Sequence, residues 1–354
     1  MKLSELDSNF KLETNIEREG LVFKDIDEQP FKIYGVYRDG ECYRRMPRSV
    51  AECSVQGTVE DLARHTSGGR VRFVTDSPYI AVKLVLPDCI AYPHLTYECS
   101  TGVDMYTNDG GGDRFRKAFL PPMDMKGGYE GVYDFGEGEP IRTVTLNMPL
   151  YNGVYRMYVG LKEGSTLLPP PDYALEKPIV YYGSSITQGG CASRPGACYQ
   201  AIIARRLDAN FINLGFSGSA RGEIPIAEYI ASLDMSMFVL DYDHNAPTPE
   251  ELLATHKPFF DVIRAKNPTL PIIIMPKPRY YRGEIESRRA GIVRATYEAA
   301  IANGDENVYF IDGPALMSEV LDDGTVDTVH PTDAGFRSMA NAIAPVIRRV
   351  LNLK

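Results

Sequence analysis

Ile179-Val-Tyr-Tyr-Gly-Ser-Ser-Ile-Thr-Gln-Gly189 is the stretch that decides both the fold and the chemistry of this chain. Its first four residues are β-branched or aromatic, which is typical of a buried strand. Gly183 allows a tight exit from that strand, and Ser184 and Ser185 then stand at the turn into a following segment. A serine at such a turn is exposed at the rim of a sheet, with its own N–H directed towards whatever its hydroxyl attacks. Taken alone, the two serines are better explained as helix N-caps.

Downstream of this stretch, short apolar strands alternate with amphipathic helices. The expected strands are 179–182, 211–214, 237–240, 272–275 and 308–311, and the expected helices are 199–207, 225–233, 249–266, 288–302 and 334–351. This alternation predicts a parallel sheet covered by helices on both faces, an α/β architecture. Ligands of such sheets bind beyond the carboxyl ends of the strands, so the chemistry is expected there.

The amino-terminal half of the chain shows a different sequence pattern. Short segments rich in β-branched residues, such as 71–74, 80–86, 143–148 and a last strand over 151–161, are separated by glycine-rich turns. This pattern predicts an antiparallel β-sandwich. Three consecutive prolines at 169–171 cannot continue a sheet ladder and stiffen the connection. We therefore expect a β-sandwich domain over residues 1–165, a Pro-rich linker over 166–177 and an α/β domain over 178–354.

Composition and charge restrict the partners. The 354 residues are 44% hydrophobic and 24% charged, and the net charge is −9. This balance is that of a soluble globular chain, and the absence of a basic stripe argues against nucleic-acid binding. An acidic surface disfavours anionic membranes, and no apolar run reaches the roughly 18 residues of a membrane span. Residues 1–20 lack the apolar core of a secretory signal, so a cytoplasmic protein is expected.

The six cysteines form no C-x-x-C pair, and no histidine lies at ligand spacing from them. Free thiols are therefore expected, with a disulfide between Cys191 and Cys198 as the alternative. His65, His94 and His256 show no constellation. No metal site and no cofactor are predicted.

Polar residues follow three other strands. Gly218 lies in a glycine-rich loop after the second strand, and Asn245 follows the third. Asp327 precedes His330 by three residues, just before the last helix, so one short loop carries a base and the carboxylate that orients it. Each residue alone also fits an ordinary loop or helix cap. Together they make a complete acyl-transfer site. Ser185 is the expected nucleophile, and its N–H, the N–H of Gly218 and the amide of Asn245 are the expected oxyanion hole.

These segments resemble the sequence blocks of the SGNH (GDSL-like) hydrolase superfamily. Gly183 to Thr187 resembles the first block, although Ser184 stands where the family usually has Asp. Ser217-Gly218 matches the second block, and Asp327-Thr-Val-His330 matches the last. His244-Asn245 falls on the third block, where Asp243 replaces a Gly and could disfavour an oxyanion nearby. The resemblance implies a flavodoxin-like, three-layer esterase domain with the catalytic set given above.

Gly102-Val-Asp-Met-Tyr106 resembles the Gly-x-Asp-Leu-Tyr motif of a β domain that precedes one SGNH subfamily. That resemblance implies a carbohydrate-directed esterase. From its residues alone, this segment is expected to be a turn between strands, and a sharper hypothesis places it over the catalytic rim. Asp104 and Tyr106 are therefore candidate substrate-binding residues.

A second set of candidate substrate-binding residues follows the fourth strand. Tyr280 and Tyr281 could stack on a sugar ring, and Arg282 could bind its hydroxyls. Exposed loop tyrosines without a ligand role remain the alternative.

The sequence thus predicts a serine esterase that hydrolyses short acyl esters, with acetyl favoured, on a small molecule or oligosaccharide through a Ser-His-Asp triad and an acyl-enzyme. Three alternatives stay open. They are a lysophospholipase or thioesterase with the same triad, acyl transfer to another alcohol, and a non-catalytic carbohydrate-binding protein. The oligomeric state is not predicted.

Overall fold

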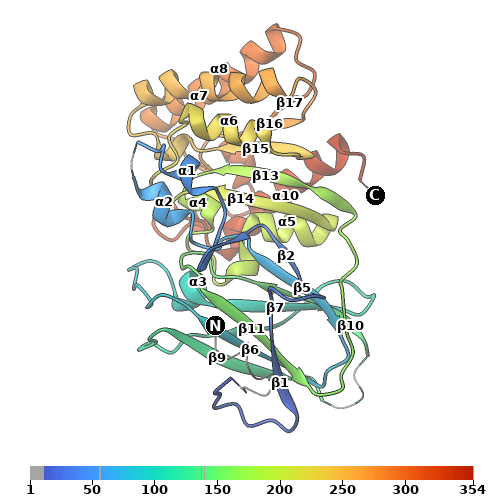
Figure 1. Ribbon diagram of the computed structural model, residues 1–354. Helices are drawn as coiled ribbons and strands as arrows, with labels where there is room; N and C mark the ends of the chain where they lie inside the picture. The colour runs from blue at the N-terminus through green and yellow to red at the C-terminus, as the bar shows by residue number, and fades with distance from the viewer. Residues whose placement is uncertain (1–11, 56, 137, 139, 354) are drawn as a thin grey trace.

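The structure is a computed structural model that describes residues 12–55, 57–136, 138 and 140–353. The first eleven residues of the charged amino-terminal stretch lie outside these ranges. An antiparallel β part occupies the lower half of Figure 1, and an α/β part lies above it. Among the described helices, none is long and apolar enough to cross a membrane.

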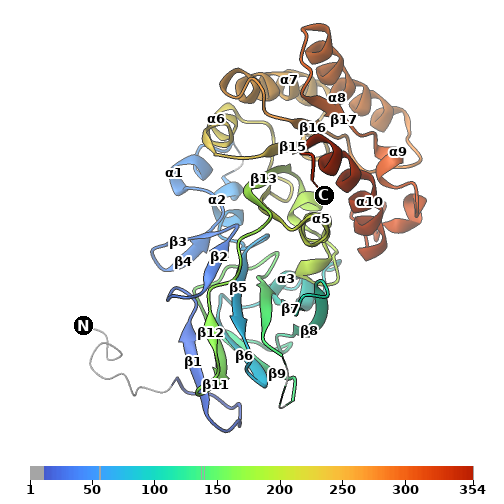
Figure 2. The same cartoon turned by 90° about the vertical axis from the view of Figure 1, so that its right-hand side faces the viewer.

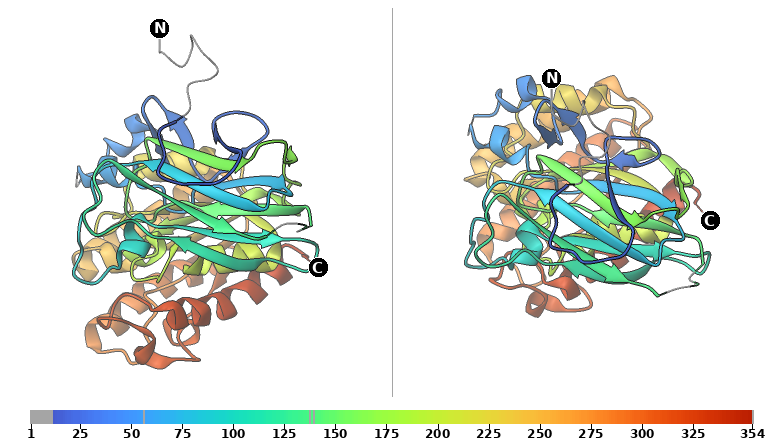
Figure 3. Two further views of the ribbon diagram at one scale, coloured as in Figure 1. Left: turned by 90° about the horizontal axis from the view of Figure 1, so that it is seen from below. Right: turned by 60° about the horizontal axis from the view of Figure 1, so that its bottom comes forward.

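The β part is built from two antiparallel sheets. Its sheet strands are β1 (Leu21–Asp25), β2 (Lys32–Tyr34), β5 (Arg70–Thr75), β6 (Tyr79–Val85), β7 (Val103–Asn108), β8 (Arg114–Phe119), β9 (Gly128–Asp134), β10 (Arg142–Asn147), β11 (Arg156–Lys162) and β12 (Leu167–Leu168). One sheet has the order β1-β11-β6-β9, and the other has the order β12-β5-β10-β7-β8 with β2 also paired to β5. Phe73, Val82 and Met157 belong to one buried apolar cluster drawn from both sheets. The predicted antiparallel β-sandwich is therefore confirmed (Figure 3).

Two expectations in this part are wrong. Gly102 to Tyr106 is not a turn, because Gly102 ends a short helix α3 (Tyr97–Thr101) and the next residues enter β7. That strand lies between β10 and β8 in its sheet, so the motif is part of the sandwich. The last long strand begins at Arg156 rather than Tyr151. The backbone N–H of Tyr151 donates instead to Ser100, which holds this segment outside the ladder.

The remaining short elements before the α/β part are β3 (Tyr37–Asp39), β4 (Cys42–Arg44), α1 (Arg48–Ala51) and α2 (Thr58–Leu62). The two helices pack towards the α/β part, whereas Tyr43 of β4 lies in the apolar cluster of the sandwich. Ala51 and Val59 lie in the same apolar cluster as Ile226 of the α/β part. The buried Arg45 donates from its guanidinium to the carbonyl oxygens of Asn213 (3.0 Å) and Gly215 (2.7 Å). The two parts are thus joined by a shared core and by buried hydrogen bonds.

The α/β part has a five-stranded parallel sheet. Its strands are β13 (Leu175–Gly183), β14 (Ala209–Gly215), β15 (Met237–Asp241), β16 (Ile272–Ile274) and β17 (Val308–Phe310), and its helices are α4 (Ser185–Gln188), α5 (Tyr199–Leu207), α6 (Ile224–Ser232), α7 (Pro249–Lys266), α8 (Glu284–Ala302), α9 (Gly313–Leu316) and α10 (Asp333–Val350). Short 3-10 turns lie at Pro195–Ala197, Asp243–Asn245 and Leu321–Gly324. The strand order is β14-β13-β15-β16-β17, the flavodoxin-like order.

Helices cover both faces of this sheet (Figure 2). Successive residues of β13 point to opposite faces, so Tyr181 packs in the cluster that contains α5 and α10, and Tyr182 packs in the cluster that contains α6 and α7. The predicted three-layer α/β/α architecture is confirmed. The segment 166–177, expected as a linker, holds β12 at one end and the start of β13 at the other, with the three prolines between them.

Candidate active site

Ser185 lies at the point where the strand order of the sheet reverses. It follows β13, which has β14 on one side and β15 on the other, and such switch points are where α/β sheets bind ligands. Ser185 is the first residue of α4, and the Ser184 hydroxyl caps this helix by accepting from the N–H of Ile186 at 3.2 Å. A Cβ at Gly183 would lie 2.0 Å from the hydroxyl oxygen of Thr187, so only glycine fits there. The sharp turn that presents Ser185 therefore follows from its neighbours.

The structure brings Ser185, His330 and Asp327 into one hydrogen-bonded chain. The Ser185 Oγ and the His330 Nε2 are 2.9 Å apart, and the His330 Nδ1 and the Asp327 Oδ2 are 2.8 Å apart. The other Asp327 oxygen accepts from the N–H of His330 at 2.8 Å and from that of Val329 at 3.1 Å. With its Nδ1 hydrogen donated to Asp327, the ring presents an unprotonated Nε2 to the serine.

Asp327 is held as a carboxylate. Partial burial raises its pKa, but the hydrogen bonds from the N–H and ring of His330 and from the N–H of Val329 outweigh this, and the pKa lies at about 2. The negative charge therefore persists at any neutral or mildly acidic pH. It is available to stabilise an imidazolium when His330 takes a proton.

Each of the three expected oxyanion donors keeps a hydrogen that makes no bond among the described residues. Neither the N–H of Ser185 nor that of Gly218 donates to another group among the described residues. Gly218 has a φ of +68°, and a Cβ there would meet nothing within 4 Å, so its backbone borders open space. The Asn245 Nδ2 donates one hydrogen to the carbonyl of Phe216 at 2.8 Å. This bond orients the amide, and its second hydrogen is left for an acceptor.

Asp243, whose carboxylate could disfavour an oxyanion nearby, has positive charges around it, and its Oδ1 makes no hydrogen bond among the described residues. Asp243 is buried and lines a cavity of about 190 Å³ together with Lys277 and Arg289. Burial raises its pKa, while a backbone hydrogen bond from Lys277 and the positive charge of Arg289 act in the other direction. The side chain is therefore turned towards cations beside the site.

The β part also contacts the candidate catalytic residues, and the sequence did not reveal these contacts. The Tyr151 hydroxyl donates to the carbonyl of Ser185 at 3.1 Å. The ring of His94 lies against the ring of His330, with 5.0 Å between centroids and 34° between planes. The expectation that His94 belongs to no constellation is therefore wrong. Its loop lies far from residue 330 in the sequence, and no local pattern marks the contact.

His94, Cys191 and His330 have ligand atoms within 4.8 Å of one another, so together they could hold a metal ion. Both ring nitrogens of His330 already bond to Ser185 and Asp327, so a metal there would compete with the hydrogen-bonded chain. Burial raises the pKa of the Cys191 thiol to about 12, which disfavours the thiolate that a metal needs. All six cysteines are free, as expected, and the alternative Cys191–Cys198 disulfide is absent.

Asp104 and Tyr106 lie beneath the loop that follows Ser185. The Asp104 carboxylate is fully buried and accepts from the N–H of Gly196 at 2.7 Å and from the Asn147 amide at 2.6 Å. The Tyr106 hydroxyl accepts from Arg194 at 3.1 Å. Both residues therefore fix the 194–196 turn onto the sandwich, and neither hydrogen-bonds to the Ser185–His330–Asp327 chain.

The second candidate set lies nearer the rim. Arg282 lines the cavity that Asp243 lines and forms an ion pair with Asp312, and Tyr281 is 62% exposed. The N–H of Tyr280 donates to Asp322 at 2.9 Å. Arg279, which the sequence did not single out, donates to the carbonyl of Thr328 at 2.8 Å and so ties this loop to the one that carries His330.

Comparison with known proteins agrees with this geometry. The profile of the GDSL-like lipase/acylhydrolase family matches residues 176–348, and the profile of the N-terminus of SGNH-type esterases, GxDLY, matches residues 21–167. A comparison with curated proteins gave no match.

Several solved structures are similar along almost the whole chain. A candidate GDSL-like lipase from Bacteroides ovatus is 29% identical, with a TM-score of 0.85 over 94% of this chain and 99% of that one. A salicylyl-acyltransferase from a tetracycline biosynthetic pathway is 20% identical, with a TM-score of 0.76 over 96% and 100%. A family two carbohydrate esterase from Clostridium thermocellum, solved with cellohexaose, is 16% identical, with a TM-score of 0.63 over 91% and 99%. At these lower identities the likeness shows the fold alone.

Proposed function

We propose that this chain is a serine esterase that removes a short acyl group, acetyl above all, from a carbohydrate. The chain belongs to the GDSL-like lipase/acylhydrolase family and carries the amino-terminal domain of SGNH-type esterases. The observation that carries this proposal is the hydrogen-bonded chain from Ser185 through His330 to Asp327 beside two unused backbone N–H groups.

In the proposed reaction, the Ser185 Oγ attacks the ester carbonyl while the His330 Nε2 takes its proton. The resulting oxyanion is stabilised by the N–H groups of Ser185 and Gly218 and by the Asn245 amide. His330 then protonates the leaving alcohol, which leaves an acyl-Ser185 intermediate. Water, deprotonated by His330, attacks this intermediate and releases the carboxylic acid. Asp327 stays ionised throughout and stabilises the imidazolium.

The surroundings of Asn245 support a small and polar substrate. Asp243, His244 and Ala246, which flank it in the chain, line a cavity of about 190 Å³ whose other walls include Lys277 and Arg282. Long acyl chains need an extended apolar groove, and this neighbouring cavity is small and half of its lining residues are charged. These features favour a hydroxyl-rich alcohol over a lysophospholipid or a long-chain thioester.

The decisive experiment compares hydrolysis of 4-nitrophenyl acetate, butyrate and octanoate by the wild type and by Ser185→Ala. We expect activity that falls steeply with chain length and drops about 10³-fold or more in the variant. Ser184→Ala is the matched control, because it removes a neighbouring hydroxyl that only caps α4, and it should retain activity within tenfold. Equal activity of wild type and Ser185→Ala would exclude Ser185 as the nucleophile.

The carbohydrate part of the proposal needs its own assay. Acetate release from acetylated xylo-oligosaccharides should occur with the wild type and vanish in Ser185→Ala. Faster cleavage of octanoate than acetate, with no release from the oligosaccharides, would favour a lipid esterase instead. Saccharide binding without any ester cleavage would favour the non-catalytic alternative.

A further inference from the structure

A second cavity lies between the sandwich and α5, at the end of the parallel sheet away from Ser185. It has a volume of about 430 Å³, within the range of small-molecule sites. Asp208, which lines it, immediately precedes β14, whereas Gly215 ends β14 beside Gly183 at the catalytic rim. About seven residues at 3.3 Å each place Asp208 roughly 20 Å from that rim, and none of Ser185, Gly218, Asn245, Asp327 and His330 lines the cavity. It is therefore separate from the candidate active site.

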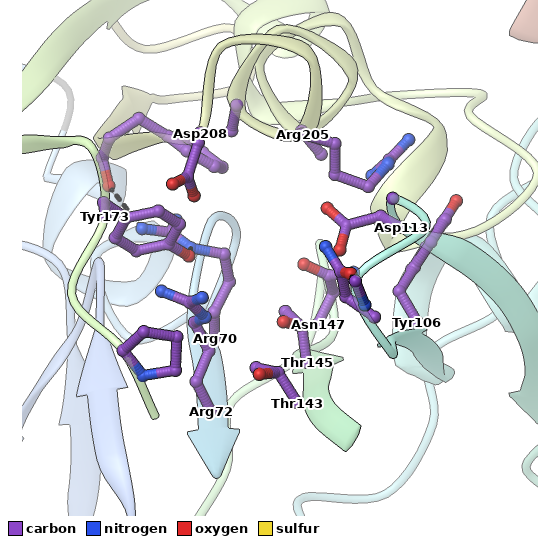
Figure 4. Close-up of a pocket in the computed structure, with 17 residues that line it drawn as sticks. Arg70, Arg72, Tyr106, Asp113, Thr143, Thr145, Asn147, Tyr173, Arg205 and Asp208 are labelled. Carbon is purple, nitrogen blue, oxygen red and sulfur yellow. Dashed lines mark hydrogen bonds between the residues drawn. The ribbon is translucent and has the colours of Figure 1, made fainter. Parts of the chain in front are cut away.

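Arginines dominate one side of the cavity, as Figure 4 shows. Arg72 is only 7% exposed, yet its guanidinium makes no hydrogen bond within the described part of the chain, and its Nε and Nη1 are buried without a partner. The ring of Tyr173 lies 4.1 Å from its charged carbon and holds it in place. The Nη2 of Arg72 also makes no hydrogen bond among the described residues and is not buried in this way, so this nitrogen can donate to an acceptor in the cavity.

The neighbouring arginines differ in this respect. Arg70 is satisfied by the carbonyls of Gly68 and Phe211 and by the Asn210 side chain. Arg205 donates to the Gly196 carbonyl and packs on the Tyr106 ring. Both add positive charge around Arg72 without competing for its ligand.

The opposite side offers hydroxyl, amide and carboxylate groups. Thr143 and Thr145 of β10 and Asn147 line it, and Asp113 lies on this side near Arg205, whereas Asp208 faces the cavity near Tyr173 (Figure 4). Asn147 uses its Nδ2 for Asp104, and its Oδ1 has no partner among the described residues. Three arginines and two aspartates leave one net positive charge. A dianion such as phosphate is disfavoured beside two carboxylates, whereas a monoanion with several hydroxyls can satisfy both kinds of group.

We propose that this cavity is a non-catalytic binding site for an acidic saccharide, whose carboxylate pairs with Arg72 and whose hydroxyls bond to Thr145, Asn147 and Asp208. A guanidinium held by aromatic stacking can donate a charge-assisted hydrogen bond from its accessible Nη2 to a carboxylate, and its positive charge stabilises the anion. The site would let the protein hold one unit of a uronate-bearing carbohydrate at a distance from Ser185. This inference does not depend on the proposed esterase activity.

The test is calorimetric titration of the full chain with D-glucuronate and D-galacturonate. D-glucose and D-galactose are controls that lack the carboxylate, and sodium acetate is a control that lacks the sugar hydroxyls. We expect a uronate to bind at least tenfold more tightly than its neutral partner and than acetate. Arg72→Met should weaken uronate binding tenfold or more, because charge-assisted hydrogen bonds are lost. Arg206→Met, which removes an exposed arginine of the same helix as Arg205 but outside the cavity, should bind as the wild type does.

Two further variants separate the possible failures. Ser185→Ala should bind uronate normally, and loss of binding in this variant would move the ligand to the active site and overturn the proposal. Thr145→Val, a nearly isosteric change on a strand, should also weaken uronate binding and serves if Arg72→Met does not fold. Uronate binding that is absent, unaffected by both cavity variants, or no tighter than acetate binding would refute the assignment. Hydrolysis of 4-nitrophenyl acetate by Arg72→Met, measured in parallel, should be unchanged.

Discussion

Replacing Asp327 by asparagine tests the acid–base assignment most sharply. Asparagine has the same shape, so its carbonyl oxygen can still accept from the N–H groups of Val329 and His330. The atom that faces the His330 Nδ1 then becomes an NH₂ donor. Two donors cannot pair, so the ring is driven to the tautomer that carries its proton on Nε2, facing Ser185. In that tautomer His330 cannot accept the serine proton.

The magnitude follows from the separation of the two groups. An imidazolium and a carboxylate 2.8 Å apart attract by about 6 kcal/mol at an effective dielectric constant of 20 and by about 1.5 kcal/mol in bulk water. The Asp327 side chain is 40% exposed, so water screens part of this attraction and about 3 kcal/mol is a reasonable loss. That is roughly a hundredfold in rate, and the wrong tautomer adds to it. We therefore expect kcat to fall by about 10³, between limits of about 10² and 10⁴.

The assay is steady-state hydrolysis of 4-nitrophenyl acetate from pH 5 to pH 9, with thermal unfolding recorded in parallel. Asp327 has a pKa of about 2, so it is ionised over this whole range and adds no limb to the wild-type profile. Because folding lowers this pKa, its contribution to stability is present above about pH 4 and disappears as the pH falls towards 2. Asp323→Asn, at an exposed acid nearby, is the matched control. More than a tenth of wild-type kcat in Asp327→Asn would refute the assignment.

Three other changes test the parts around this chain. Asn245→Ala should lower kcat by about 10²–10³ with little change in KM, because its amide is expected to contact the substrate only when the oxyanion develops. Steady-state kinetics that show a rise in KM alone would contradict this role. Asp104→Ala removes the acceptor of two buried donors and should lower the free energy of unfolding by about 2–4 kcal/mol. Urea titration measures this, and an unchanged midpoint would argue against a structural role of Asp104. Tyr151→Phe should cost only about 1 kcal/mol of stability and leave kcat within a few-fold, since Gly189 and Gly190 also donate to the Ser185 carbonyl. A large fall in kcat would instead make the hydroxyl a positioning group.

The α/β part was predictable because its signals are local. Each expected strand and helix is present with its ends shifted by four residues or fewer, since apolar runs and amphipathic periods are properties of short windows. The positions of Ser185 and Asn245 beyond β13 and β15 then follow from the rule that parallel strands share one carboxyl edge. His330 needed only its spacing from Asp327, because three residues suffice to close the turn between them.

The β part resisted prediction where contacts are distant. Gly102 to Tyr106 contains a glycine and an aspartate, and both favour turns in isolation. The buried acceptor role of Asp104, which receives the N–H of Gly196, outweighs that preference, and no window around residue 104 contains that partner. The contact of His94 with His330 has the same character. Sequence patterns predict which side chains of a segment are buried, but they do not predict which distant residues those side chains contact.

These distant contacts bear on what the sandwich does for the reaction. A module that only tethered a carbohydrate would need no contact with the candidate catalytic residues, yet Tyr151 bonds to the Ser185 backbone and the His94 ring packs against that of His330. The buried guanidinium of Arg45 reaches the carbonyl of Gly215, three residues before Gly218, and so supports the loop that carries this expected oxyanion donor. Each of these groups acts on a different member of the candidate site. The β part therefore contributes contacts to the candidate active site, and we expect the two parts together, rather than the α/β part alone, to carry the proposed activity.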